Sequence, residues 1–210
     1  MRLLKPGLLL GLFSLFATAC SADSSPAYAL GKQYRLVSQV QAPDNPKRNS
    51  VEEFFWYGCP HCFHLEPEVN SWLEHKPADV DFVRVPNTLG RDIGVVHQRA
   101  FYIAVALGIL DKTHEALFEA IHQQGFPMSS LESIRDLYVE KAGIVPGDFD
   151  AISNSFVVDG NMRQADAAAL TYGITGTPTI VVGGKYIVDA QENMFKVVDF
   201  VVDKVRKERK

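Results

Sequence analysis

Cysteine is scarce in this chain, with only three in 210 residues. A structural zinc site needs four ligands at short spacing, but only Cys59 and Cys62 lie close together, and Cys20 falls in the N-terminal segment. A c-type haem attachment needs histidine directly after the second cysteine of the pair, and Phe63 stands there. A purely structural disulfide between Cys59 and Cys62 would close too short a loop to restrain the unfolded chain much. Redox chemistry is therefore the leading hypothesis for the pair.

The chain also lacks a long hydrophobic run, an excess of positive charge and internal repeats. The apolar run at residues 8–17 is too short for a membrane span, which needs about 20 residues. The formal net charge is -4, so nothing indicates a nucleic-acid-binding protein. With 47% hydrophobic and 22% charged residues, the composition predicts one sizeable domain, or one domain with an insertion.

The N-terminus has the pattern of an export signal. Two basic residues precede the apolar run, which predicts a signal peptide over residues 1–19. The segment Ala17-Thr18-Ala19-Cys20 resembles the lipobox of bacterial lipoproteins, in which the cysteine becomes lipidated, although alanine opens it where leucine is usual. Cleavage after Ala19 or after Ala29 without lipidation of Cys20 is the alternative. Either outcome places the mature chain in a compartment that tolerates disulfides.

The most informative motif is Cys59-Pro60-His61-Cys62, directly after the apolar run at residues 51–57. If a helix begins here, its unpaired N–H groups and positive dipole end favour a thiolate at Cys59, which predicts the nucleophile. Cys62 lies one turn further on and is the expected resolving thiol. Pro60 fits the first helical turn, and a positive charge on His61 would further favour the thiolate. The motif therefore predicts a low thiol pKa and an oxidising pair.

Hydrophobic periodicity predicts an α/β fold around this motif. A strand at 51–56, a helix at 60–75 kinked by Pro67 and a strand at 80–85 form a right-handed βαβ unit. Helical patterns follow at 97–110, 113–123, 129–142 with a capping box at 129–132, 146–154 and 160–172. Strands at 177–182 and 185–188 form a hairpin around Gly183-Gly184. A C-terminal helix follows, and we expect the basic residues at its end to suit the helix dipole and do no more; they are Arg206, Lys207, Arg209 and Lys210.

These patterns predict a thioredoxin-like fold with an inserted helical domain. We place a linker and the start of the mature chain at residues 20–50, the thioredoxin-like domain at 51–90 and 174–210, and the helical insertion at 91–173. The remaining histidines share no spacing with Asp or Glu that marks a metal site or a hydrolytic triad, so we expect them at surface or capping positions. They are His64, His75, His97, His114 and His122.

Beyond about residue 30 the chain resembles the DsbA family of periplasmic thiol:disulfide oxidoreductases. The resemblance rests on residues 54–62, the helical insertion, Gly176-Thr177-Pro178-Thr179 and the hairpin. It implies an enzyme that donates its Cys59–Cys62 disulfide to exported, folding proteins with free thiols, needs no organic cofactor or metal, and is reoxidised by a DsbB-like membrane quinone reductase. DsbA is itself the standard example of a low-pKa cysteine and a strong oxidant, so only the direction of these effects is predicted from this sequence.

The resemblance also assigns residues outside the cysteine motif. It makes Pro178 a cis-proline that turns the backbone of Thr177 outward, where an extended substrate can pair as an added strand. It makes Glu53 a buried acid and a proton relay for the buried thiol, with Arg84 as a charge partner. Without the resemblance, an inward carboxylate on this strand would still need a partner. Apart from the resemblance, Trp56 and Tyr57 form either an apolar rim that receives unfolded substrate or part of the strand core and its cap.

One departure from the family pattern leaves the direction of the reaction open. Many DsbA proteins have an aliphatic residue before the cis-proline, whereas Thr177 is similar to the choice in isomerase relatives. Too few residues precede Val51 for the dimerisation domain that isomerases usually carry, so we expect a monomeric oxidase. The alternatives are a disulfide isomerase, a reductant for cytochrome maturation and an exported peptide-binding chaperone.

Overall fold

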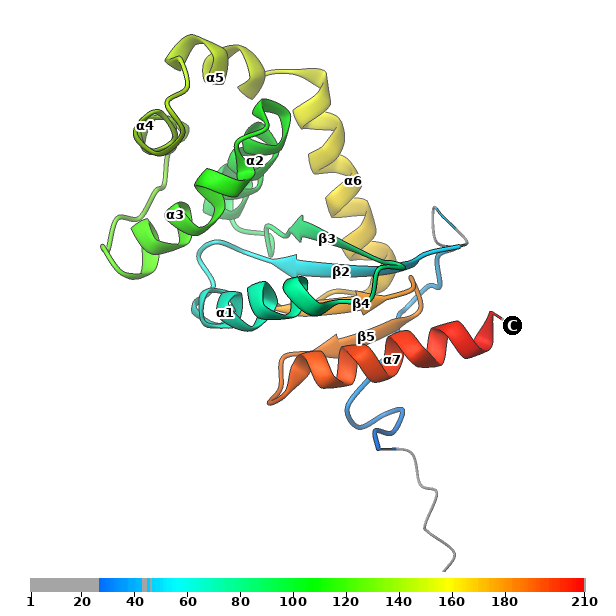
Figure 1. The fold of residues 1–210 in the computed structure, drawn as a ribbon. Helices are drawn as coiled ribbons and strands as arrows, with labels where there is room; N and C mark the ends of the chain where they lie inside the picture. Colours follow the sequence, from blue (N-terminus) through cyan, green and yellow to red (C-terminus); the bar gives the residue numbers. More distant parts are fainter. Residues whose placement is uncertain (1–26, 43–44, 46, 210) are drawn as a thin grey trace, which may run out of the picture.

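A mixed five-stranded sheet forms the centre of the protein (Figure 1). The computed structural model describes residues 27–42, 45 and 47–209, so the predicted signal peptide and Cys20 lie outside the described residues. The sheet order is β1-β5-β4-β2-β3. The strands are β1 (Arg35–Leu36), β2 (Asn49–Phe55), β3 (Val80–Pro86), β4 (Thr179–Val182) and β5 (Tyr186–Asp189). The parallel pairing of β2 with β3 and the antiparallel β4–β5 hairpin confirm the predicted βαβ unit and hairpin.

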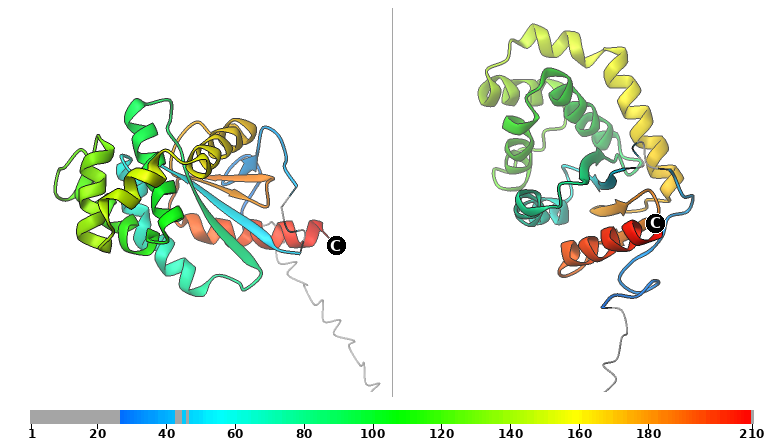
Figure 2. Two further views of the ribbon diagram at one scale, coloured as in Figure 1. Left: turned by 90° about the horizontal axis from the view of Figure 1, so that it is seen from above. Right: turned by 45° about the vertical axis from the view of Figure 1, so that its right-hand side comes forward.

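Helices cover both faces of the sheet, and a group of four helices lies beside one end of it (Figures 1 and 2). They are α1 (Pro60–His75), α2 (Asp92–Leu107), α3 (Leu110–His122), α4 (Leu131–Ala142), α5 (Pro146–Ser153), α6 (Phe156–Tyr172) and α7 (Met194–Glu208). Helices α1 and α7 lie on one face, α6 lies on the other, and α2 to α5 gather beside the end of β2. In the described part of the chain, no helix has the length and apolar character to cross a membrane.

The alternation of side chains along β2 explains how it joins three parts of the core. Val51 packs with residues of α1 and α7, whereas Phe54 points to the opposite face and packs with residues of α6. Phe55, at the end of the strand, belongs to the cluster that fills the space between α2, α3, α4 and α5. All three side chains are fully buried. The strand that leads into the Cys59 motif is therefore held by helices packed on both faces of the sheet and by the helical cluster, which consists of α2, α3, α4 and α5.

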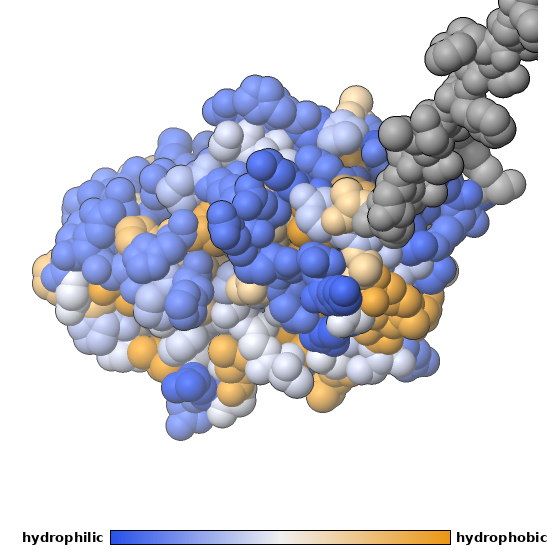
Figure 3. Space-filling view, turned by 90° about the horizontal axis from the view of Figure 1, so that it is seen from below, coloured by the Kyte–Doolittle hydropathy of each residue, from blue (hydrophilic) through white to orange (hydrophobic). Residues whose placement is uncertain are grey.

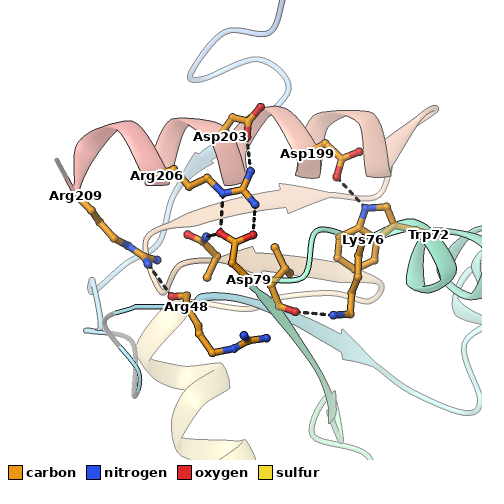
Figure 4. Close-up of polar contacts among 10 residues, drawn as sticks. Arg48, Trp72, Lys76, Asp79, Asp199, Asp203, Arg206 and Arg209 are labelled. Atoms are coloured by element: carbon orange, nitrogen blue, oxygen red, sulfur yellow. Dashed lines mark hydrogen bonds and ion pairs between the residues drawn. The ribbon is translucent and has the colours of Figure 1, made fainter.

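Polar contacts fix α7 against the turn between α1 and β3 (Figure 4). Arg206 donates from Nε to Asp79 Oδ2 at 2.9 Å and from Nη2 to Oδ1 of the same carboxylate. Trp72 of α1 donates its indole N–H to Asp199 at 2.9 Å. The expectation that the basic end of this helix serves only the dipole is thus wrong for Arg206. The outer face of the molecule on this side is mostly hydrophilic (Figure 3).

Several boundaries differ from those predicted. Residues 35–36 form the short strand β1 within the expected linker, and Tyr34 and Val37 beside it are buried. Helix α1 is continuous through Pro67. The cap of α4 is Ser130, which accepts from Ser133 N at 3.2 Å, so the expected capping box with Glu132 is wrong by one residue. Helices α2, α3 and α6 each begin three to five residues earlier than their periodicity indicates.

Candidate redox active site

The two cysteines lie at the junction between β2 and α1. Cys59 is the N-cap of the helix, and its backbone N–H donates to Trp56 O at 2.9 Å, which closes a tight turn. Pro60 is the first helical residue, where a missing N–H costs nothing. Both cysteines are free thiols in this structure. Cys62 is fully buried and Cys59 is 7% exposed, so only Cys59 reaches solvent.

The surroundings give the two thiols opposite proton affinities. The pKa of Cys59 is lowered to about 5, chiefly by a hydrogen bond from the Cys62 thiol, then by Thr177 and the backbone N–H groups of Cys62 and His61, against the effect of burial. Burial raises the pKa of Cys62, as do the hydrogen bond and charge of Cys59. At neutral pH the pair therefore holds one thiolate and one thiol. His61 acts here through its backbone N–H.

The loop before β4 completes the site above Cys59. The Thr177–Pro178 peptide bond is cis, and Cys59 Sγ lies 3.4 Å from Thr177 O, to which it donates when it is protonated. The Thr177 hydroxyl is buried and has no hydrogen-bond partner of ordinary geometry among the described residues. It therefore lowers the pKa of Cys59 less than the Cys62 thiol does. Pro178 lines a shallow hollow together with His61, Leu65 and Met194. The resemblance-based expectation of a cis-proline beside the dithiol agrees with this geometry.

Glu53 is a fully buried carboxyl group on β2. Arg84 stands opposite it in the β2–β3 register, with Arg84 Nε 3.5 Å from Glu53 Oε2. The two groups are close enough for an ion pair but do not form a hydrogen bond, because neither Glu53 oxygen accepts one in the described part of the chain. Burial, and then the charge of Glu66, raise the pKa of Glu53 to about 8, while Arg84 acts in the opposite direction. Glu53 can therefore gain or lose a proton near neutral pH.

Sequence reasoning identified Arg84 as a partner of this carboxyl but missed Glu66 and His114, which share the same polar group of side chains. Arg84 donates from Nη2 to Glu66 Oε2 at 2.8 Å, so its stronger bond goes to Glu66. Burial opposes ionisation of Glu66, but His114 and Arg84 together lower its pKa. Glu66 is one turn after Cys62 on the buried stripe of α1, which is the signal that could have identified it.

Three histidines occupy positions other than those predicted. His97 and His114 are buried rather than at the surface or at caps. His114 lies within hydrogen-bond distance of Tyr57 Oη, at 2.8 Å, and of Glu66 Oε1, at 3.3 Å, and these polar partners allow its burial. His122 reaches Tyr57 O at 2.7 Å. His114 shares the apolar face of α3 with Leu117 and Phe118, a spacing that indicates an inward position.

The two aromatic residues before Gly58 have different environments. Tyr57 is 1% exposed and belongs to the core. Trp56 is half-buried and lies over Gly58, since a Cβ atom at position 58 would come within 2.3 Å of the indole ring. The Arg91 guanidinium lies over the Trp56 ring at 5.3 Å from its centroid. Of the two, only Trp56 offers apolar surface beside Cys59.

The described residues contain no group of three or more His, Cys, Asp or Glu side chains placed to hold a metal ion.

Comparison with protein families gives one match over more than half of the chain. Residues 86–201 match the model of the DSBA-like thioredoxin domain. The thiol:disulfide interchange protein DsbA of Pseudomonas aeruginosa is 37% identical over 203 residues, which cover 94% of each chain. The thiol:disulfide interchange protein DsbA of Azotobacter vinelandii is 36% identical, with 98% of this chain and 99% of that protein covered.

Solved structures agree with the sequence relatives. The crystal structure of Pseudomonas aeruginosa DsbA superposes with a TM-score of 0.80 at 37% identity, covering 86% of this chain and 96% of the other. A crystal structure of a variant of the same protein gives a TM-score of 0.81. Reduced DsbA1 from Neisseria meningitidis has a TM-score of 0.74 at 24% identity, which supports the fold alone.

Proposed function

Because the chain belongs to the DsbA family and is a thiol:disulfide oxidoreductase with a thioredoxin fold, we propose that it oxidises exported proteins through Cys59 and Cys62. The observation that supports this direction is the asymmetry of the two thiols. The pKa of Cys59 is lowered to about 5, so the reduced dithiol is stabilised as a thiolate. A stabilised reduced form makes the corresponding disulfide a better oxidant.

The reaction proceeds through two exchanges in this proposal. A substrate thiolate attacks Cys59 Sγ, the Cys59–Cys62 bond breaks, and Cys62 leaves as a thiolate that takes up a proton. A second substrate thiolate then attacks the substrate sulfur of the mixed disulfide, and Cys59 leaves as a stable thiolate. The substrate loses two electrons and the enzyme gains them. Pro60 and His61 set the helix start that stabilises Cys59, since Pro60 begins α1 and His61 supplies a backbone N–H.

Glu53 is the proposed proton relay for Cys62. Cys62 is buried and its pKa is raised, so its thiolate needs a proton at once when the disulfide opens. Glu53 is the buried acid on the strand that leads into the site, and its pKa of about 8 lets it carry a proton at neutral pH. Arg84 moderates the pKa of Glu53 from the neighbouring strand.

Substrate recognition is proposed on the surface around Cys59. The backbone of Thr177 beside the cis bond to Pro178 pairs with an extended segment of unfolded protein, and Trp56 supplies an apolar rim. The partners are unfolded or folding exported proteins with free thiols, and a DsbB-like membrane protein as reoxidant. We further propose a monomer in the periplasm, with lipidation at Cys20 as one form of the mature chain.

The proposed domain division follows the chain order of the elements. We propose that residues 51–90 and 174–210 form the thioredoxin-like domain and residues 91–173 the helical insertion, while residues 20–50 lead into the first domain and contribute β1 and the beginning of β2 to its sheet. Residues 1–19 are the proposed signal peptide.

A disulfide isomerase is the second candidate, favoured by Thr177. The decisive test adds the purified, oxidised chain to a reduced, unfolded protein and follows disulfide formation, while a second sample contains the same protein with scrambled disulfides. We expect fast oxidation and poor rescue of the scrambled protein. Efficient rescue would favour the isomerase, and binding to unfolded protein that survives Cys59→Ser without any turnover would favour a chaperone.

A further inference from the structure

Helix α3 of the helical cluster holds Tyr57, the residue two positions before Cys59, at both of its ends. At the side-chain end, Tyr57 Oη lies 2.8 Å from His114 Nδ1. At the backbone end, His122 Nε2 lies 2.7 Å from Tyr57 O. The two histidines are two turns apart on α3, so both face the same side of the helix. The turn that leads into Cys59 is thus held from outside the sheet, by a single helix.

The hydrogen-bond partners fix the protonation pattern at His114. Glu66 has a lowered pKa, so its carboxylate can only accept, and it accepts from His114 Nε2–H. His114 Nδ1 is then the acceptor for the Tyr57 hydroxyl. Burial lowers the pKa of His114 and raises that of Tyr57, which keeps both groups neutral. The Tyr57 hydroxyl is thereby tied to Glu66, the carboxylate that takes the stronger bond of Arg84.

His122 contacts both sides of the junction between β2 and α1. Its ring stacks on Phe63 with centroids 5.0 Å apart and planes at 15°, while Nε2–H donates to Tyr57 O. The backbone N–H of Phe63 in turn donates to Cys59 O at 3.1 Å. His122 therefore bridges the turn before Cys59 and the first turn of α1.

We propose that His114 and His122 are positioning residues for the dithiol, because they hold Tyr57 and so fix the turn that sets Cys59 at the beginning of α1. The inference rests on the proposed function and goes beyond it by giving the helical cluster a part in the reaction. The Cys62 thiol stabilises the thiolate of Cys59 most, and the backbone N–H groups of Cys62 and His61 stabilise it further. Those groups reach the sulfur only if Cys59 keeps its N-cap conformation, at φ -90° and ψ 114°. A turn released from α3 would sample other conformations and stabilise the thiolate less.

The test compares three variants of one residue type. His122→Leu removes the donor to Tyr57 O, and His122→Gln retains an N–H donor at a similar reach. His75→Leu is the matched control, because His75 lies at the far end of α1, is exposed, and bonds only to Ser71 O of its own helix among the contacts described. The readouts are the pH dependence of Cys59 alkylation in the reduced protein and the rate at which the oxidised protein oxidises a dithiol peptide.

We expect His122→Leu to move the alkylation midpoint to higher pH and to slow peptide oxidation roughly two- to tenfold, the worth of one hydrogen bond. His122→Gln should recover most of the wild-type profile, and His75→Leu should match wild type. A merely structural role of His122 would lower the melting temperature and leave the alkylation midpoint unchanged, and that result would overturn the inference.

Tyr57→Phe tests the contact at the side-chain end of Tyr57, and it still tests the inference if His122→Leu does not fold. It keeps the buried ring and removes the hydroxyl, and we expect the alkylation midpoint to rise. An unchanged midpoint in Tyr57→Phe would contradict a role for His114. If wild type and His75→Leu both fail to oxidise the peptide, the proposed function is wrong. The alkylation profiles still test the positioning of Cys59 in that case, because they do not depend on peptide oxidation.

Discussion

At the scale of single residues, Cys59 and Cys62 have the same side chain and opposite proton affinities. Hydrogen bonds from the Cys62 thiol and, to a smaller extent, from helix N–H groups favour the thiolate at Cys59, whereas burial favours the thiol at Cys62. We expect the alkylation rate of Cys59 in the reduced protein to reach half its maximum near pH 5, where its pKa lies. An ordinary cysteine would reach half its maximum near pH 8.5, about 3.5 units higher. Alkylation by iodoacetamide, followed by mass spectrometry between pH 3 and about 9, measures this directly.

Replacement of Cys62 tests the cause of the low pKa of Cys59. The largest stabilisation of the Cys59 thiolate is the hydrogen bond from the Cys62 thiol. Cys62→Ala should therefore shift the midpoint upward, and Cys62→Ser, which keeps a donor, should shift it less. Equal midpoints in all three proteins would contradict the assigned cause.

Glu53 gives a prediction about stability. The folded pKa of about 8 lies above the ordinary value of 4.5, so the folded protein binds this proton more tightly than the unfolded chain does. The contribution of Glu53 is most favourable below pH 4.5 and is lost as the pH rises toward 8. Glu53→Gln should therefore be more stable than wild type at pH 7, by roughly 1–3 kcal/mol. Urea unfolding at several pH values should show this difference disappear below about pH 4.5, and a difference independent of pH would contradict it.

The site residues differ in how far sequence reasoning could identify them. Cys59 and Cys62 stand in a motif whose spacing alone predicts their chemistry. Glu66 and His114 act through partners that are distant in the chain, since Glu66 bonds to Arg84 of β3 and His114 bonds to Tyr57 in the turn before Cys59. Their sequence patterns indicate burial but do not identify a partner.

At the scale of elements, the cap of α4 can be tested against a neighbouring serine. Ser130 is the N-cap and accepts from Ser133 N, whereas Ser129 is exposed and lies before the cap. Ser130→Ala should lower the free energy of unfolding by about 0.5–2 kcal/mol because one helix N–H loses its partner. Ser129→Ala should change it by less than about 0.5 kcal/mol. Equal effects in thermal unfolding would contradict the assignment of the cap.

Elements with strong periodicity were predicted well, and those held by distant contacts were not. The parallel pair of β2 and β3, helix α1 and the hairpin follow from their hydrophobic patterns and turn residues. Strand β1 has two residues and exists through its pairing with β5, which its own sequence does not indicate. The first turns of α2 and α6 do contain apolar residues, but Val95, Phe156 and Val157 are exposed, so they do not continue the buried stripe of their helices.

At the scale of the whole molecule, the low pKa of Cys59 links redox state to folding. The thiolate contributes stability to the reduced protein at pH values above its folded pKa of about 5, and this contribution is lost as the pH falls through that value. The reduced protein should therefore melt at a higher temperature than the oxidised protein at pH 7, and the gap should shrink below about pH 5. Calorimetry of both forms at pH 7 and pH 4 checks this, with Cys59→Ser as a control that has no such redox-dependent gap.

The central claim is that the Cys59–Cys62 disulfide is an oxidant. It is tested most directly by equilibrating the purified protein with reduced and oxidised glutathione at pH 7 and measuring the fraction of reduced dithiol. The account predicts a potential clearly above that of thioredoxin, which is about -270 mV, and toward the oxidising values near about -120 mV. A potential at or below about -270 mV would contradict it and would identify the pair as a reductant.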